Sequence, residues 1–459
     1  MLKLYNSLSQ EKEIFQALQA REVKIYVCGM TVYDYCHLGH MRMLMAFDLV
    51  VRYLRFLQYK VCYVRNITDI DDKIIKRANE NKEDYRELTA RFIQAMQEDI
   101  EALNLLPPDK EPRATAFIPE MLALIKQLIQ KDYAYQAENG DVFFNVRRFP
   151  RYGCLSHRNI DELESGARIE INEVKKDPLD FVLWKMAKPG EPAWDSPWGL
   201  GRPGWHIECS AMAMNLLGEQ FDIHGGGRDL IFPHHENEIA QSEAASGKPF
   251  VKTWMHNGYV QINKEKMSKS LGNFLTIREL LAQYPAEAVR YFLIASQYRS
   301  PLQFSETAIP QAYQALERFY IALRGQASTK ALENSSYEAR FIEAMNDDLN
   351  TPLALAVLFE LAHEIHRLRE KDKNQAAAHA GLLRKLGGVL GILQQEPEAF
   401  LKTALRVDEA VVEQLIHARN EARAQKNWTE ADRLRQELAA LSIVLEDGPE
   451  GTTWRYELR

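Results

Sequence analysis

The beginning of the chain shows two short apolar runs with a longer segment of helical periodicity between them. Residues 24–28 and 60–67 are rich in β-branched and aromatic side chains and predict short strands. Over residues 41–58, apolar side chains recur three and four positions apart, which is typical of one buried helix face. These side chains are Leu44, Phe47, Val51, Leu54 and Leu57. A strand, a helix and a strand without a hairpin turn predict a βαβ unit in a parallel sheet.

The middle of the chain follows a different pattern. Residues 119–131 predict an amphipathic helix, and Asn139-Gly140 between two aromatic-rich runs predicts a β-hairpin. Residues 186–204 are rich in Pro, Gly and Trp and predict a loop. Because none of this continues the βαβ pattern, we expect an inserted connective segment that divides the parallel-sheet domain. The three parts are residues 1–118, 119–200 and 201–305.

Beyond about residue 305, Gly and Pro become less frequent and helical periodicity dominates to about residue 440. The predicted helices span residues 309–324, 336–346, 352–371, 376–394, 408–424 and 428–441. The tail from Ile443 predicts a strand or a hairpin. The sequence thus predicts an α/β fold, with a Rossmann-like parallel-sheet domain and its insertion, then a helical bundle (306–400) and a small C-terminal unit (401–459).

The composition is that of an ordinary globular protein, with 46% hydrophobic and 26% charged residues among 459. No apolar run of about 18 residues occurs and the first residues lack an apolar signal core, so we expect no transmembrane helix and a cytoplasmic protein. The 5 cysteines are widely spaced without a CxxC pair, which argues against a disulfide framework and excludes a sequence-local zinc knuckle. A net charge of -7 gives no support to nucleic-acid binding, although local basic patches can still hold a polyanion.

His37-Leu38-Gly39-His40 falls where the first predicted strand leads into the helix, and ligands bind at such junctions in open parallel sheets. Gly39 lets a flat adenine ring approach the backbone, the helix N-terminus favours negative charge, and two imidazoles can donate hydrogen bonds to phosphate oxygens. We therefore predict an ATP site at His37, Gly39 and His40. The alternative is a turn with two surface histidines.

Lys266-Met267-Ser268-Lys269-Ser270 places two ammonium groups and two hydroxyls in one loop. A departing pyrophosphate gathers negative charge in the transition state, so lysines that meet it there raise the rate rather than tighten ground-state binding. Lys266, Ser268 and Lys269 are the candidate contacts. The alternative is a solvated surface loop, the usual interpretation of two such lysines taken alone.

Cys28, Cys209, His234 and Glu238 each lie beside one of these segments and are candidate ligands of one Zn²⁺ ion. Thiolate, imidazole and carboxylate groups all suit zinc, and a helix would place His234 and Glu238, four residues apart, on one face. His235 is the second choice for His234, and we expect it to point off the ligand face. The alternative is two buried cysteines and a capped histidine without a metal.

The two signatures together make the chain resemble the class I aminoacyl-tRNA synthetases, whose motifs are written HIGH and KMSKS. Leu38 stands where the family usually has Ile, and the second motif matches at every position. Further segments are similar to the cysteine-specific members of that family, and the similarity runs nearly end to end. They are residues 28–34, 222–227, 232–238, 346–352 and 451–455.

This resemblance implies ATP-dependent ligation of L-cysteine to tRNA(Cys) through a cysteinyl-adenylate, with Mg²⁺ accompanying ATP. It also implies that Cys28, Cys209, His234 and Glu238 are the zinc ligands. Zinc binds a thiolate strongly and a neutral hydroxyl poorly, so it would separate cysteine from serine, whereas an apolar pocket separates near-isosteres only about 10²-fold. The inserted segment is short for an editing domain, which agrees with selection by zinc.

Further candidates for the amino-acid pocket are Thr31, Tyr33, Trp205, His206, His224 and Asp229. We expect Asp229 to hold the substrate ammonium, with Thr31 or Tyr33 as alternatives, and ordinary packing competes with a binding role for each. Residues 65–73 follow the second predicted strand, and they either line the site or start a helix capped by Asp69.

The last two predicted helices carry basic residues near Trp428 and Trp454, a combination that suits the splayed bases of an RNA loop. The basic residues are Arg419, Arg423, Lys426, Arg433 and Arg435. The alternative is a solvated helix face over core tryptophans, whereas the resemblance implies an anticodon-binding region. We expect a monomer.

Two other functions remain open from the sequence. A related ligase joins cysteine to an amino-sugar and has no need of the helical C-terminal half. A non-catalytic RNA-binding module has no need of the histidines and lysines of the two signatures.

Overall fold

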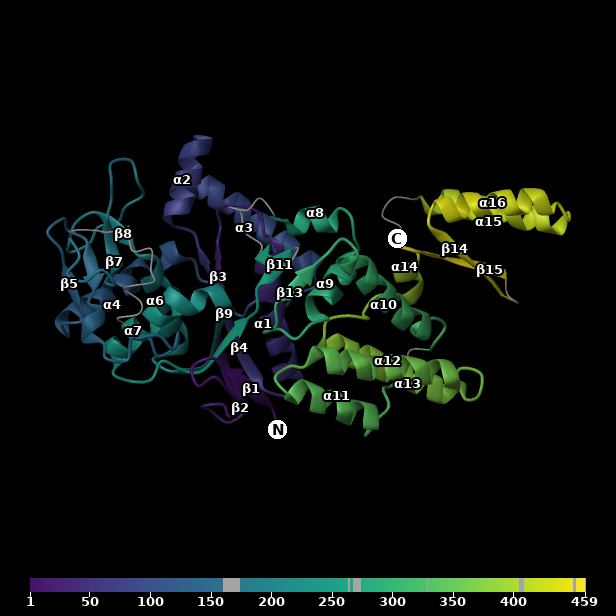
Figure 1. Cartoon of the computed structure of the whole chain (residues 1–459), viewed down its shortest axis with the longest axis horizontal. Coiled ribbons are helices and arrows are strands. Elements are labelled where there is room, and N and C mark those ends of the chain that lie inside the picture. Colours follow the sequence, from purple (N-terminus) through teal and green to yellow (C-terminus); the bar gives the residue numbers. More distant parts are fainter. Residues whose placement is uncertain are drawn as a thin grey trace.

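The computed structural model describes residues 1–159, 174–262, 265–266, 274–327, 329–403, 408–448 and 451–458. At its centre stands a four-stranded sheet whose neighbouring strands all run parallel (Figure 1). In order across the sheet, the strands are β10 (Val251–Asn257), β9 (Phe221–Gly227), β3 (Glu22–Thr31) and β4 (Lys60–Thr68). Helix α1 (Leu38–Phe56) joins β3 to β4, so the predicted βαβ unit is confirmed.

The order of the strands creates a switch point between β3 and β9. From β3 the chain passes through α1 to β4 on one side, whereas β9 and β10 are added later on the other side. Connections that leave a strand in opposite directions open a crevice at the carboxyl ends of the strands, and ligands bind there in open α/β sheets.

Alternating side chains of β3 belong to two different hydrophobic cores. Ile25 and Val27 pack with α1 on one face of the sheet, while Tyr26 and Cys28 pack on the other face with two further helices. These helices are α6 (Trp205–Leu217) and α7 (Glu236–Ser246). Because helices cover both faces of the sheet, β3 has apolar side chains on both of its faces and forms a nearly continuous apolar run in the sequence. Cys28 consequently points to the side of the sheet on which α6 and α7 lie.

The segment between β4 and α6 contains helices and an antiparallel sheet of order β5-β6-β7-β8. Its described elements are α2 (Asp72–Asn81), α3 (Tyr85–Ala102), α4 (Ile118–Gln130), β5 (Ala134–Gln136), β6 (Val142–Phe144), β7 (Phe181–Met186) and β8 (Gly201–Pro203). The hairpin predicted around Asn139-Gly140 is confirmed by the pairing of β5 with β6. Strand β8 lies within the predicted loop 186–204, because an edge strand tolerates Gly and Pro.

Short elements complete the half of the chain that carries the sheet. They are β1 (Lys3–Asn6), β2 (Glu11–Ile14), β11 (Val260–Ile262), β12 (Glu265–Lys266), β13 (Leu302–Phe304), α8 (Ile277–Leu281), α9 (Ala286–Ile294) and the turns η1 (Ala114–Phe117), η2 (Val146–Arg148), η3 (Arg228–Leu230) and η4 (Ile231–His235). None of the helices among the described residues is long and apolar enough to cross a membrane.

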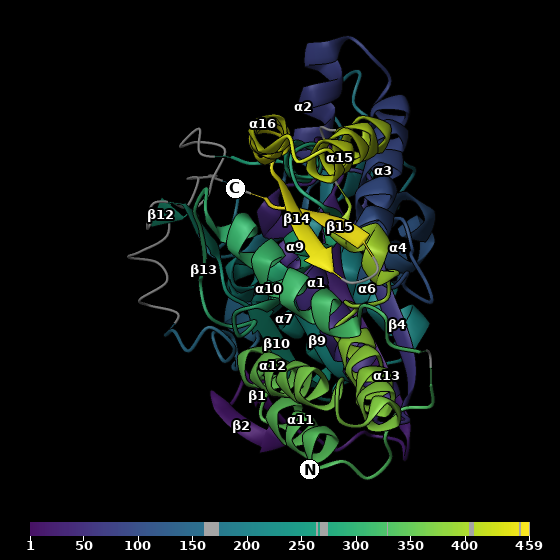
Figure 2. The same ribbon diagram turned by 90° about the vertical axis from the view of Figure 1, so that its right-hand side faces the viewer.

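The second half of the chain is helical, as the periodicity predicted. Its elements are α10 (Ala308–Leu323), α11 (Ser336–Asn346), α12 (Thr351–Leu368), α13 (Lys373–Val389), α14 (Pro397–Leu401), α15 (Glu409–Ala424), α16 (Trp428–Ala440), β14 (Ile443–Gly448) and β15 (Gly451–Tyr456). Helix α13 ends before the predicted residue 394, because Gly391 takes a positive φ of 72° just beyond it. Figures 1 and 2 show α15, α16 and the β14–β15 hairpin as a unit apart from α11 to α13.

Candidate active site and metal centre

A cavity of about 320 Å³ lies at the carboxyl ends of β3, β9 and β10, next to the switch point of the sheet. The residues of its lining that the sequence analysis had selected are Thr31, Tyr33, His37, Gly39, His40, Trp205 and Asp229. His206 and His224 are not among the residues that line it. The structure therefore brings the first signature and most of the predicted amino-acid contacts into one cavity.

His37 caps the start of α1 and its ring stacks on that of His40. The two ring centroids are 3.5 Å apart, with 15° between the ring planes. The backbone N–H of His40 donates to His37 Nδ1 at 3.2 Å, and the backbone N–H of His37 donates to His40 Nδ1 at 3.4 Å. Because both Nδ1 atoms accept, each neutral ring carries its proton on Nε2, and Nε2–H is the group that can bind a phosphate oxygen at this helix start.

The segment that follows the second signature lies against this helix start. The N–H of Leu38 donates to the carbonyl of Leu275 at 3.0 Å. The ring of Phe274 meets the ring of His37 edge-on, with 5.1 Å between centroids. The chain that leaves the lysine-rich loop is therefore attached to the element that carries the paired histidines.

The segment that enters this loop is held by a small sheet. The backbone of Lys266 lies in β12 and pairs with Gln261 of β11. Ser268 and Lys269 lie outside the described residues, so their contacts with pyrophosphate remain predictions. The described chain before the loop starts at the cavity, because β11 follows directly after Tyr259 of the cavity lining.

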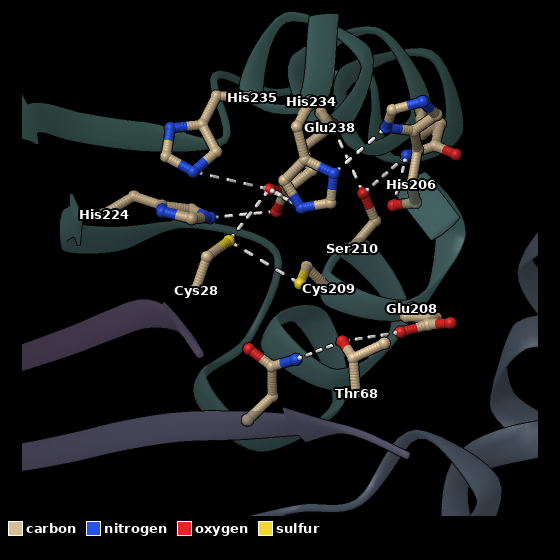
Figure 3. A network of polar contacts seen from close by, with 12 residues as sticks. Cys28, Thr68, His206, Glu208, Cys209, Ser210, His224, His234, His235 and Glu238 are labelled. Atoms are coloured by element: carbon tan, nitrogen blue, oxygen red, sulfur yellow. Dashed lines mark hydrogen bonds and ion pairs between the residues drawn. The ribbon is translucent and has the colours of Figure 1, made fainter. Parts of the chain in front are cut away.

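Cys28, Cys209, His234 and Glu238 form a buried cluster beside the cavity, and each residue is at most 2% exposed. One ligand-type atom from each lies within 4.8 Å of all the others. Cys28 Sγ is 3.6 Å from Cys209 Sγ and 3.3 Å from Glu238 Oε1, and His234 Nε2 is 3.3 Å from the same oxygen. Figure 3 shows these side chains pointing toward one another from β3, α6, η4 and α7.

The electrostatics of the cluster suit a soft divalent cation. Burial raises the pKa of the Cys28 thiol well above its ordinary value, and Cys209 and Glu238 raise it further. Burial likewise raises the pKa of Cys209 and lowers that of His234. Thiolates therefore need a positive charge beside them. Two sulfurs, an imidazole nitrogen and a carboxylate oxygen fit Zn²⁺, whereas Mg²⁺ and Ca²⁺ prefer oxygen ligands.

His224 and His235 surround the same carboxylate and create a second ligand set with Cys28 and Glu238, whose atoms also lie within 4.8 Å of one another. His224 Nε2 is 2.8 Å from Glu238 Oε2, and His235 Nε2 is 3.9 Å from Oε1. The expectation that His235 points off the ligand face is therefore wrong.

The local backbone explains this correction. His234 and His235 belong to η4, a π-helical turn that contains non-helical φ/ψ angles at Phe232, and α7 begins only at Glu236. His235 and Glu236 have right-handed helical φ/ψ angles, so His235, three residues before Glu238, and His234, four residues before it, lie on one helix face and both reach that carboxylate. His224 fits a supporting role, because its contact with Oε2 orients the carboxylate and turns Oε1 toward the thiols.

Trp205 and His206 lie on the other side of His234. The Trp205 ring stacks on the His234 ring with 4.2 Å between centroids and also lines the cavity, so it contacts both the cavity and a candidate ligand. His206 Nδ1 is 3.0 Å from His234 Nδ1, and burial lowers the pKa of His206 to about 3. A neutral His206 can accept a hydrogen bond from the Nδ1–H of His234, and the Nε2 lone pair of His234 then faces the cluster.

The sequence did not point to Asn257, the last residue of β10, or to Tyr259 just beyond it, and both line the cavity. Their only signal was their place at the end of an apolar run that we did not assign to a strand. Lys73, at the end of segment 65–73, lines the cavity and lies 5.7 Å from the centre of the Tyr33 ring. That segment therefore reaches the site.

The helix cap predicted at Asp69 is wrong. Asp71 caps α2 by accepting from the Lys73 N–H at 2.8 Å. Asp69 instead accepts from the N–H and the hydroxyl of Thr115, at 2.9 and 2.6 Å. An acidic residue can stabilise a turn in several ways, and the tertiary contact with Thr115 has no local signal in the sequence.

In the C-terminal unit, several of the predicted basic residues are held by acidic partners. Arg419 and Arg423 both contact Asp447 Oδ2 at 2.9 Å, and Arg419 is buried. Trp454 is buried and only Trp428 is exposed, at 60%. The exposed aromatic surface suited to a nucleic-acid base therefore lies at Trp428, on the first residue of α16.

Comparisons with known families divide the chain into three matched regions. The family described as "tRNA synthetases class I (C) catalytic domain" matches residues 14–314. The family described as "DALR domain" matches residues 340–394. The family described as "Cysteinyl-tRNA ligase anticodon binding domain" matches residues 409–455.

Curated relatives are similar to the whole chain. A cysteine--tRNA ligase of Thioalkalivibrio sulfidiphilus (strain HL-EbGR7) is 60% identical over 99% of this chain and 100% of the relative. One of Azotobacter vinelandii (strain DJ / ATCC BAA-1303) is 60% identical over 99% of each chain. Among solved structures, a Mycobacterium tuberculosis methionyl-tRNA synthetase in complex with methionyl-adenylate matches 83% of this chain and 91% of that chain, with a TM-score of 0.57 at 15% identity, which supports the fold alone.

Proposed function

We propose that this chain, which belongs to the family of cysteine--tRNA ligases, joins L-cysteine to tRNA(Cys) in an ATP-dependent reaction. The observation that carries the proposal is the cavity at the switch point, which adjoins a buried cluster of two cysteines, a histidine and a glutamate. A nucleotide site beside a thiol-selective metal site is the arrangement that activation of cysteine requires.

The reaction proceeds in two steps without a protein nucleophile. The carboxylate of cysteine attacks the α-phosphate of ATP, and pyrophosphate leaves with the electron pair of the broken P–O bond. A hydroxyl of the 3′-terminal ribose of the tRNA then attacks the carbonyl of cysteinyl-adenylate, and AMP leaves. Catalysis in both steps consists of positioning and of stabilising charge on phosphate oxygens.

Each candidate residue has a separate role in binding the substrates. His37 and His40 donate from Nε2 to phosphate oxygens, and Gly39 leaves room for the nucleotide. Asp229 accepts hydrogen bonds from the substrate ammonium, and Thr31 and Tyr33 of the same cavity lining are the alternatives. Lys266, Ser268 and Lys269 meet the departing pyrophosphate.

Zn²⁺ is held by Cys28, Cys209, His234 and Glu238, the set that contains both thiols. When bound, zinc supplies a preference for a thiolate over a hydroxyl, which is the difference between cysteine and serine. His224 orients Glu238, and His206 fixes the tautomer of His234. Mg²⁺ accompanies ATP.

We assign the remaining parts of the molecule in the same way. Residues 1–118 and 201–305 form the catalytic domain, 119–200 the inserted connective segment, 306–400 the helical bundle, and 401–459 the anticodon-binding region. The enzyme acts as a monomer in the cytoplasm.

Cysteine-dependent exchange of pyrophosphate into ATP tests the proposal, with serine as the control and with metal-stripped protein beside the native protein. We expect exchange with cysteine only, lost on stripping and restored by Zn²⁺. Exchange that persists without metal would remove the cluster from substrate selection. Absence of exchange with both amino acids would overturn the proposed reaction.

A further inference from the structure

Two of the three residues between the proposed ligands His234 and Glu238, namely Glu236 and Asn237, are buried and bind a distant turn. Glu236 Oε2 accepts from the N–H and the hydroxyl of Ser156, both at 2.8 Å, and from the N–H of Leu155 at 3.1 Å. Its neighbour Asn237 accepts through Oδ1 from the hydroxyl of Tyr152 at 2.5 Å. Glu236 is 0% exposed and Asn237 1% exposed, so neither contact is a solvated surface pair.

The donors all come from residues 151–157 of the inserted segment, which we call the clasp. Gly153 has a φ of +93°, and a Cβ there would lie 2.1 Å from the carbonyl oxygen of Arg158. The N–H of Arg158 donates back to the Gly153 carbonyl at 3.2 Å, so the turn is closed by its own backbone. Tyr152 and Leu155 are buried in the hydrophobic core that includes Ile239 of α7. Its own backbone hydrogen bond and the burial of Tyr152 and Leu155 therefore hold the clasp in one conformation, with its hydrogen-bond donors directed at α7.

The clasp holds the chain where η4 passes into α7. His234 lies in η4, before the regular hydrogen bonding of α7 begins, whereas Glu238 lies in the first turns of α7. The distance between the two ligands therefore depends on how the start of α7 is held. Metal ligands need to stay within about 0.5 Å of their productive positions, and outer contacts supply that constraint.

We propose that the clasp positions the metal centre: by holding Glu236 and Asn237 it fixes the spacing between His234 and Glu238, and thereby the strength of metal binding. This inference rests on the proposed function, in which these ligands hold zinc. It makes the inserted segment a part of the cysteine-selecting site, although none of its clasp residues belongs to the ligand set. Tyr152 and Ser156 are positioning residues that act through Asn237 and Glu236.

The test removes clasp donors without changing α7. Tyr152→Phe removes the hydroxyl that binds Asn237, and Ser156→Ala removes one of the donors to Glu236. Arg151→Ala is the matched control, because Arg151 belongs to the same turn and binds the same helix, but at Glu243, beyond the ligands (2.7 Å). Each single variant and the Tyr152→Phe/Ser156→Ala double variant are compared with wild type, so a poorly folding double variant does not decide the outcome.

The primary measurement is the zinc dissociation constant, obtained by competition with a chromophoric chelator, together with the visible spectrum of Co²⁺-substituted protein. We expect about tenfold or greater weakening of zinc binding in the double variant, a smaller loss in each single variant and a shifted Co²⁺ spectrum, with Arg151→Ala unchanged. In pyrophosphate exchange, KM for cysteine should rise while KM for ATP stays constant.

Clasp variants that lower thermal stability but keep the zinc dissociation constant, the Co²⁺ spectrum and the KM for cysteine of wild type would overturn the inference, since the clasp would then only pack the inserted segment. A wild-type protein that fails to bind zinc would overturn the proposed metal centre itself and the positioning role with it. The two failures are therefore distinguishable in one titration.

Discussion

At the scale of single residues, the buried polar network converges on the carboxylate of Glu238. One oxygen lies 2.8 Å from His224 Nε2, and the other lies 3.3 Å from both Cys28 Sγ and His234 Nε2. Burying a carboxylate beside two thiols whose pKa values are raised by burial costs free energy, and a divalent cation at this point offsets that cost. The cluster is therefore expected to stabilise the fold as well as select the substrate.

Cys209→Ser should lose zinc and cysteine activation together, because a neutral hydroxyl is a poor zinc ligand. Purified variant protein should contain well below one zinc per chain, and its melting temperature should no longer rise when Zn²⁺ is added. Cys62→Ser is the control, because Cys62 lies on β4 outside both candidate ligand sets. Metal analysis and pyrophosphate exchange decide the matter, and a Cys209→Ser protein with normal zinc content would contradict the assignment.

Asp99 makes stability depend on pH. Burial raises the pKa of Asp99 to about 6, although Arg278, with its Nε 3.4 Å from Oδ1, opposes the rise. Since the folded-state pKa lies above the ordinary value of 3.8, the stability linked to this carboxyl is fully present below about pH 4 and is lost as the pH rises through about 6. Asp99→Asn should therefore stabilise the fold by about 1–2 kcal/mol at pH 7 and change it little at pH 4. Urea unfolding at both pH values measures this, and an equal gain at both would count against it.

At the scale of elements, apolar periodicity was enough to predict the βαβ unit, the hairpin at Asn139-Gly140 and the helices of the second half. It did not predict η4, where the backbone at Phe232 leaves helical φ/ψ angles. The residue types of the metal ligands were visible in the sequence, and spacings of three and four residues allow both His235 and His234 to reach Glu238. The approach of Cys28 and Cys209 to that carboxylate depends on the packing of distant elements, which no local pattern records.

Trp428 exposes an aromatic ring at the start of α16, and we predict that it contacts the tRNA. Stacking of a base on an exposed aromatic ring contributes about 1–3 kcal/mol. Trp428→Ala should therefore raise the KM for tRNA(Cys) about tenfold or more and leave tRNA-independent pyrophosphate exchange unchanged. Val411→Ala, an exposed apolar residue of the neighbouring α15 (44% exposed), is the matched control. Equal effects of the two variants on charging would show that Trp428 does not contact the tRNA.

At the scale of the whole molecule, the parallel pairing of β3 with β4 followed from the order of predicted elements, but the switch point beside β9 and the joining of distant segments did not. Asp348 illustrates this. It is 0% exposed and accepts from the N–H of Tyr5 at 2.8 Å, from the hydroxyl of Tyr298 at 2.9 Å and from Arg299 Nε at 2.6 Å. One carboxylate in segment 346–352 thus connects the N-terminal strand, the chain before β13 and the junction of α11 with α12.

Because Asp348 joins the sheet domain to the helical bundle, its charge should matter for the cooperativity of the whole fold. Asp348→Asn keeps the size of the side chain but turns an amide N–H₂ toward donors, and leaving such buried groups without an acceptor costs about 1–3 kcal/mol. The adjacent Asp347→Asn is the matched control, since Asp347 is 48% exposed and pairs only at the surface with Lys12, at 2.7 Å, which is worth less than about 1 kcal/mol. Urea unfolding should show a large loss of stability in Asp348→Asn, with the helical bundle unfolding before the sheet domain, and almost no change in Asp347→Asn. If the two variants lose the same small amount, the two parts of the molecule are held together by apolar packing of α1, α9 and the bundle helices rather than by this carboxylate.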